Sequence, residues 1–146
     1  MAWIELTAAD VEARLSGPEL AHCQRALADF QSDPTPEILS QVADDIRGYL
    51  LANAENRVGP AGTIPAQLKR DALAVAVWEL GNRLGMAGKQ LLTLERKGAM
   101  EAAVRKFEMA AKGEYVVEQP PADEDGPETG PAVKPSAFGS EERFTP

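Results

Sequence analysis

Apolar residues recur at steps of three and four over most of the first 113 residues, which is the period of an amphipathic helix. Thr7 and Asp10 have the spacing of a capping pair, so a short helix is predicted from about Ala8 to Leu15. Pro18 opens a second predicted helix and Pro36 a third. The third has the clearest apolar stripe, and its opposite side is interpreted as a solvated face formed by Gln41, Asp44, Asp45 and Arg47.

The middle of the chain predicts a long loop followed by a central helix. Residues 53–63 are rich in turn formers, and the stretch is longer than the usual connection of about 4 to 6 residues. Pro65 opens the next helix, which is apolar around most of its circumference between Asp71 and Glu79. A helix of this kind is expected at the centre of a bundle.

Three glycines then predict an interruption of helix. Gly81, Gly85 and Gly88 lie close together, and each costs about 1 kcal/mol relative to alanine in a helix interior. We therefore expect a bend or a break there. Apolar periodicity resumes from about Leu94, and Gly113 has the position of a C-terminal cap for this last helix.

The composition changes at residue 114. Residues 114–146 hold six of the eleven prolines and eight acidic groups against two basic ones, so they carry −6 of the total charge of −8. Such a segment cannot bury enough apolar surface to offset the entropy of ordering. The sequence thus predicts an all-α protein with a four- to five-helix bundle over residues 1–113. An extended, proline-rich acidic arm over residues 114–146 is expected to be disordered until bound.

The residues that carry chemistry do not form a convincing site. The single histidine and the single cysteine are neighbours, His22 and Cys23, and successive helix residues point about 100° apart. We interpret both as structural. The chain has no CxxC or HExxH motif, and the glycines before Lys89 lack the Lys-Ser/Thr ending of a phosphate-binding loop. The expected protein is not an enzyme and has no catalytic residue, cofactor or metal.

Charge and hydropathy limit the classes of partner. Residues 1–113 carry only −2 of the total −8 and have no basic run, which gives little affinity for nucleic acid. No window approaches the roughly 20 apolar residues of a membrane span, and the N-terminus lacks the features of a signal peptide. We expect no membrane partner and a cytosolic protein until assembly.

Two stretches of the arm carry apolar groups that suit partner binding. Tyr115, Val116 and Val117 form a strand-like run, which suits addition to the sheet of a partner. Phe138 and Phe144, with Arg143 beside the latter, suit pockets on a partner surface. Fully extended, the arm would reach roughly 100 Å.

The order of features along the chain is also distinctive. It comprises an aromatic leader, an acidic apolar helix ending in tyrosine, a helix opened by proline after a variable loop, and a last helix ending at glycine. These stretches are Met1–Asp10, Ala43–Leu50, Ile64–Leu73 and Phe107–Gly113. The order resembles that of the head-tail adaptor (neck) proteins of Mu-like phages and prophages, and Glu142-Arg143-Phe144-Thr145 is similar to a short closing motif of many of them. The helix with His22 and Cys23 departs from the pattern, because relatives often have an acidic loop there.

The resemblance implies a structural virion protein at the head-tail interface, made in the host cytoplasm. It implies a homo-oligomeric ring, twelvefold to match the portal, between the portal protein and the tail-terminator or another neck protein. The ring would line the channel through which genomic DNA passes without sequence-specific binding. The alternative is a DNA-packaging or regulatory protein that binds DNA through its first three helices. That function needs a basic recognition face, whereas Arg14, Arg25 and Arg47 are scattered.

Overall fold

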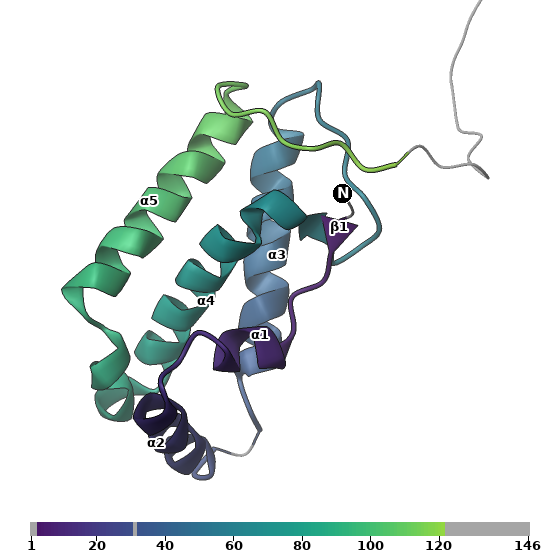
Figure 1. Cartoon of the computed structure of the whole chain (residues 1–146). Helices are drawn as coiled ribbons and strands as arrows, with labels where there is room; N and C mark the ends of the chain where they lie inside the picture. The colour runs from purple at the N-terminus through teal and green to yellow at the C-terminus, as the bar shows by residue number, and fades with distance from the viewer. Residues whose placement is uncertain (1–2, 31, 122–146) are drawn as a thin grey trace, which may run out of the picture.

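The computed structural model describes residues 3–30 and 32–121, which form a helical bundle (Figure 1). The helices are α1 (Ala8–Glu12), α2 (Gly17–Leu27), α3 (Thr35–Leu51), α4 (Lys69–Arg83) and α5 (Leu94–Ala111), with 3-10 helices η1 (Ala66–Leu68) and η2 (Gly85–Leu91). The short strand β1 (Trp3–Ile4) pairs antiparallel with β2 (Ile64–Pro65). The predicted all-α class is confirmed, whereas the small strand pair was not predicted.

Local sequence explains where the helices begin. The Thr7 hydroxyl accepts a hydrogen bond from the Asp10 backbone N–H at 3.2 Å, and the Asp10 carboxylate accepts from the Thr7 N–H at 2.9 Å. Ser16 and Glu19 form the same reciprocal capping box at the start of α2. Each box satisfies two backbone groups that a helix end otherwise leaves unpaired.

Helix α4 lies at the centre of the bundle, as predicted. It packs against α1, α3, α5 and η2, and α3 and α5 flank it in Figure 1. Its buried positions are Ala72, Leu73, Ala76, Val77, Leu80 and Gly81. Most of these side chains are small, which lets neighbouring helices approach closely. None of the helices within residues 3–30 and 32–121 is long and apolar enough to cross a membrane.

The glycine-rich stretch interrupts the helix, as predicted. Gly85 has a φ of +62°, a conformation that favours glycine, and the chain then turns through η2 before α5 begins. A Cβ on Gly88 would overlap the Gly81 carbonyl and lie 2.8 Å from the Leu84 Cβ. The close approach of Gly81 and Gly88 therefore packs the connection against the end of α4.

The folded body extends beyond the predicted boundary at Gly113. Gly113 has a φ of +79° and ends the last helix, but residues 114–121 then return across the bundle (Figure 1). Val117 is only 2% exposed, and Pro120 is also buried. Residues beyond the predicted boundary at 113, as far as Pro120, therefore pack on the body. The average composition of residues 114–146 concealed a short stretch with its own apolar contacts and hydrogen-bond partners.

Candidate interaction site formed by the C-terminal segment and the helical body

Trp3 anchors the C-terminal segment, defined here as residues 114–121, to the N-terminal strand. The indole Nε1–H of Trp3 donates to the Glu118 carbonyl at 3.0 Å. The ring is 8% exposed and lies against Gly59, where an added Cβ would be 3.2 Å from ring carbons Cδ2 and Cε3. Glycine at position 59 therefore leaves room for the indole.

Gln67, in η1, binds the backbone of the same segment. Its side-chain Oε1 accepts a hydrogen bond from the Glu118 N–H, and its Nε2 donates to the Val116 carbonyl at 3.3 Å. Nε2 also lies 3.3 Å from the Tyr115 hydroxyl. One amide thus satisfies a backbone donor and a backbone acceptor, as a neighbouring strand would.

The loop after α3 provides further contacts. The Arg57 backbone N–H donates to the Gln119 side-chain oxygen at 2.7 Å, and the Arg57 guanidinium donates to the Pro120 carbonyl at 3.0 Å. The Gln119 amide in turn donates to the Asn56 side-chain oxygen at 3.0 Å. We call Trp3, Asn56, Arg57 and Gln67 the clasp, because together they hold residues 115–120.

Arg47 supports the clasp from α3. Its guanidinium donates to three loop carbonyls, those of Gly59 at 3.1 Å, Pro60 at 2.9 Å and Thr63 at 2.8 Å. The interpretation of Arg47 as part of a solvated face was therefore wrong, although Asp44 and Asp45 are exposed. Charge-assisted hydrogen bonds of this kind fix the loop that seats the Trp3 ring.

The predicted anchors of the strand-like run have unequal environments. Val117 is a buried residue of its own chain, Tyr115 is partly buried with the Lys106 Nζ 5.5 Å from its ring centroid, and Val116 is 84% exposed. The run is not a strand in this structure. Val117 is thus committed to the core, whereas partner binding by Tyr115 and Val116 stays a prediction. Phe138, Arg143 and Phe144 lie outside the described residues.

A cavity lies where the C-terminal segment leaves the clasp. It has a volume of about 700 Å³ and is lined by Arg57, Val58, Gly59, Pro60, Pro120 and Pro121. Both prolines at positions 120 and 121 have a fixed φ, which stiffens this part of the chain.

The residues considered for chemistry have structural contacts. The His22 Nε2 lies 2.5 Å from the Ala87 carbonyl, which links α2 to η2. Cys23 is 2% exposed, and burial raises the pKa of its thiol, which disfavours the reactive thiolate. Within residues 3–30 and 32–121, no group of three or more His, Cys, Asp or Glu side chains is arranged to hold a metal ion.

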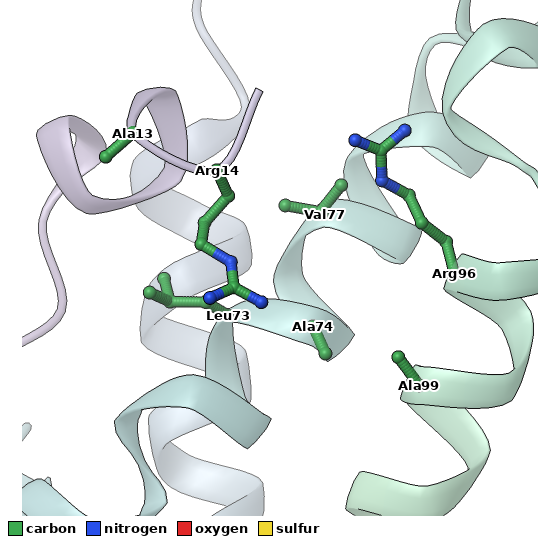
Figure 2. Close-up of a pocket in the computed structure, with 7 residues that line it drawn as sticks. All are labelled: Ala13, Arg14, Leu73, Ala74, Val77, Arg96 and Ala99. Atoms are coloured by element: carbon green, nitrogen blue, oxygen red, sulfur yellow. The ribbon is translucent and has the colours of Figure 1, made fainter. Parts of the chain in front are cut away.

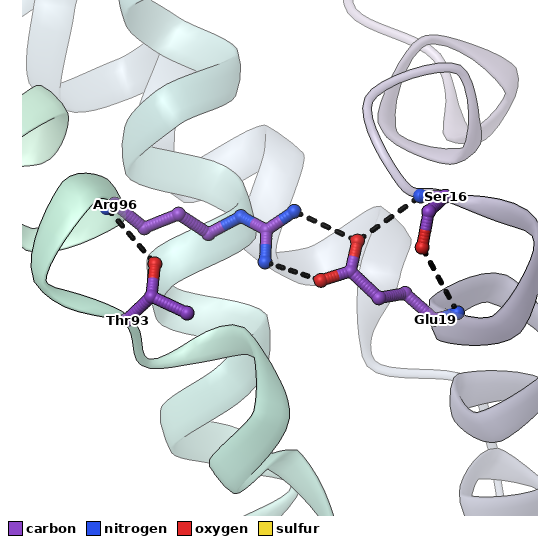
Figure 3. Close-up of polar contacts among 4 residues, drawn as sticks. All are labelled: Ser16, Glu19, Thr93 and Arg96. Carbon is purple, nitrogen blue, oxygen red and sulfur yellow. Dashed lines mark hydrogen bonds and ion pairs between the residues drawn. The ribbon is translucent and has the colours of Figure 1, made fainter.

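Glu19 and Arg96 join α2 to the start of α5. Figure 3 shows the Arg96 guanidinium facing the Glu19 carboxylate in a two-pronged ion pair, with N–O distances of 2.7 and 2.9 Å. Hydrogen bonding from Arg96, reinforced by the Ser16 backbone N–H, lowers the pKa of Glu19 to about 2. The pair therefore remains ionised over almost the whole range in which the protein can be studied.

No known protein-family model, curated protein or solved structure matches the chain. The role of the clasp is therefore inferred from the contacts of its own residues. The sequence singled out the run from Tyr115 to Val117, but the contact of this run with Trp3 was not predicted. The roles of Gln67 and Arg57 could not be predicted from the sequence. A polar residue in a turn gives no indication of which distant backbone group its side chain binds.

Proposed function

We propose that the protein is a structural phage virion protein, a head-to-tail adaptor that forms a ring between the portal and the next neck or tail protein. The observation that carries the proposal is the clasp. It holds residues 115–120 on the helical body, so the acidic stretch of residues 122–146 starts from a defined point beside Pro121. An arm tethered at a fixed point raises the local concentration of its anchors near a neighbouring subunit.

Charge supports the same function. The chain has a net charge of −8, which suits the wall of a channel through which DNA must pass without being held. The resemblance to Mu-like adaptors supplies the proposed partners, which are the portal protein, a tail-terminator or other neck protein, and further copies of this chain in a twelvefold ring. The proposed location is the head-tail interface of the virion.

The experiment that tests the adaptor function uses the phage or prophage that encodes the chain. We expect removal of the gene to leave heads and tails that remain separate, and expression of the full chain from a plasmid to restore joined particles. Negative-stain electron microscopy counts the three kinds of particle. Joined particles at normal frequency without the protein would overturn the proposal.

The arm is tested separately by two truncations and a replacement. Removing residues 122–146 preserves the clasp, whereas removing residues 114–146 also removes Val117 from the core. We expect the first truncation to fold and to lose joining, and the second also to lose stability. Replacing residues 122–146 by an equally long glycine and serine linker is the matched control, and normal joining with that linker would contradict a role for the arm sequence.

A further inference from the structure

A basic groove lies between α1, α4 and α5, away from the clasp. Its floor is formed by Leu73, Ala74 and Val77, and its walls include Arg14, Arg96 and Ala99; its volume is about 390 Å³. Figure 2 shows the side chains of Arg14 and Arg96 on opposite sides of α4, with the guanidinium of Arg14 extending over Leu73 towards Ala74. The groove thus combines small apolar side chains with two arginines.

The two arginines differ in how far they are neutralised. Arg96 is held in place by its two-pronged ion pair with Glu19, which neutralises its charge. The Arg14 side chain has no hydrogen bond or ion pair to any residue that the structure describes. Arg70, which is exposed, lies one turn before Leu73 and Ala74 on the same face of α4.

Two acidic side chains of the flanking helices are paired with lysines. Asp10 of α1 lies 3.1 Å from the Lys69 Nζ, and Asp71 of α4 lies 3.0 Å from the Lys106 Nζ. Arg14 and Arg70 are the exposed arginines beside the groove, within a chain whose net charge is −8. The complement of the groove is a ligand that carries both carboxylates and an apolar side chain that lies on the floor of Leu73, Ala74 and Val77.

One stretch of residues 122–146 has this chemistry. Phe138-Gly139-Ser140-Glu141-Glu142-Arg143-Phe144 combines two adjacent carboxylates with two aromatic rings, whereas the earlier acidic run Asp123-Glu124-Asp125 has no aromatic neighbour. From Pro121 to Phe138 the chain has 17 residues, which could span up to about 60 Å. Helix α5, the longest that the structure describes, spans about 27 Å, so this length is enough to reach the groove from the clasp.

We propose that the groove between Arg14 and Arg96 binds the Phe138–Phe144 stretch of this chain, with a phenyl ring on the floor of Leu73, Ala74 and Val77 and the glutamates at Arg14. This inference deepens the adaptor function by naming where the arm docks. It rests on the proposed adaptor function only in one respect, that the arm comes from a neighbouring copy in a ring. Self-association through an acidic arm and a basic groove would link neighbouring subunits of a ring.

The test uses a fluorescent peptide of residues 136–146 and the full chain with Phe138→Ala and Phe144→Ala, which leaves the groove free. We expect saturable binding by fluorescence anisotropy, weakened about tenfold by Arg14→Gln in the recipient and by exchanging both peptide glutamates for glutamine. The recipient control is Arg25→Gln, which changes an exposed arginine of α2 without a side-chain partner among the described residues.

A groove-filling pair makes the test independent of charge. Ala99→Trp places a ring at the groove wall, whereas Ala102→Trp adds the same ring at an exposed position outside it. We expect only the first to abolish binding. Absence of saturable binding, equal binding to Arg14→Gln and Arg25→Gln variants, or displacement of the peptide by duplex DNA would overturn the inference. The binding assay uses purified protein and no phage particles. Its failure would therefore leave the adaptor function untouched, since that function is tested by counting joined particles.

Discussion

The indole of Trp3 and the carbonyl of Glu118 are hydrogen-bonded at 3.0 Å although 115 positions separate them in sequence. This bond joins the first strand of the body to its last described segment. It also depends on Arg47, because the loop that Arg47 holds supplies the glycine on which the Trp3 ring lies. Arg47 therefore helps to position the C-terminal segment without contacting it, through the loop and the Trp3 ring.

Replacing Trp3 by phenylalanine should loosen the C-terminal segment while leaving the helices folded. Phenylalanine keeps an aromatic ring but loses the donor, so the hydrogen bond from the indole to the Glu118 carbonyl is lost and stability should fall by about 1 kcal/mol. Hydrogen exchange at residues 114–121 should rise more than exchange in α4. Trp78→Phe is the control, because the Trp78 indole has no hydrogen bond among the described residues. Equal exchange in both variants would contradict a fixing role for Trp3.

Val117 and Val116 provide a matched pair that tests the corrected boundary of the body. Val117 is 2% exposed and Val116 is 84% exposed. Val117→Ala should therefore lower the free energy of unfolding by about 2 kcal/mol, whereas Val116→Ala should change it by less than about 0.5 kcal/mol. Urea unfolding of the two variants measures both values. Similar small changes in both would mean that residues 114–121 do not belong to the cooperative unit.

The helical part of this fold was predictable because its signals are local. The capping pair of Thr7 and Asp10, the proline starts and the cluster of glycines each act within one or two helix turns, and each marks the structural change that was expected. The first helix is shorter than predicted and ends at Glu12, since its last residues continue only as a turn.

The clasp could not be predicted because its contacts connect distant positions. Gln67 binds a backbone about fifty residues later, and nothing in the sequence around it differs from an ordinary helix start. Arg47 was assigned to solvent because a helix face with two aspartates is usually solvated, yet its long side chain reaches the carbonyls of a nearby loop. Averaging the composition of residues 114–146 likewise hid the apolar position at Val117.

The ion pair of Glu19 and Arg96 predicts a loss of stability in acid. The folded pKa of Glu19 is about 2 against an ordinary value of 4.5, so its contribution is complete above about pH 5 and is lost as the pH falls from about 4.5 towards 2. With the Glu19 side chain 22% exposed, the contribution should be on the order of 2 kcal/mol. Comparing urea unfolding of the wild type with Glu19→Gln from pH 2 to pH 6 measures it.

A second ion pair provides the control for this titration. Glu37 and Arg83 are also joined, at 3.2 Å, but their side chains are 66% and 39% exposed. Exposed pairs contribute about 0 to 1 kcal/mol, so Glu37→Gln should leave the pH profile almost unchanged. If Glu19→Gln and Glu37→Gln show the same profile, the acid sensitivity has another source.

Alanine substitutions at Gly88, in the connection between α4 and α5, and at Gly98, within α5, should change stability in opposite directions. A Cβ on Gly88 would overlap the Gly81 carbonyl and approach the Leu84 Cβ to 2.8 Å, whereas a Cβ on Gly98 would meet nothing within 4 Å. Gly88→Ala should destabilise the protein by about 1 to 3 kcal/mol through overpacking, because backbone must shift to admit the methyl group. Gly98→Ala should stabilise it by about 1 kcal/mol, since α5 gains helix propensity. Thermal unfolding followed by circular dichroism should show shifts of opposite sign. A raised midpoint for Gly88→Ala would mean that Gly88 is not in contact with Gly81.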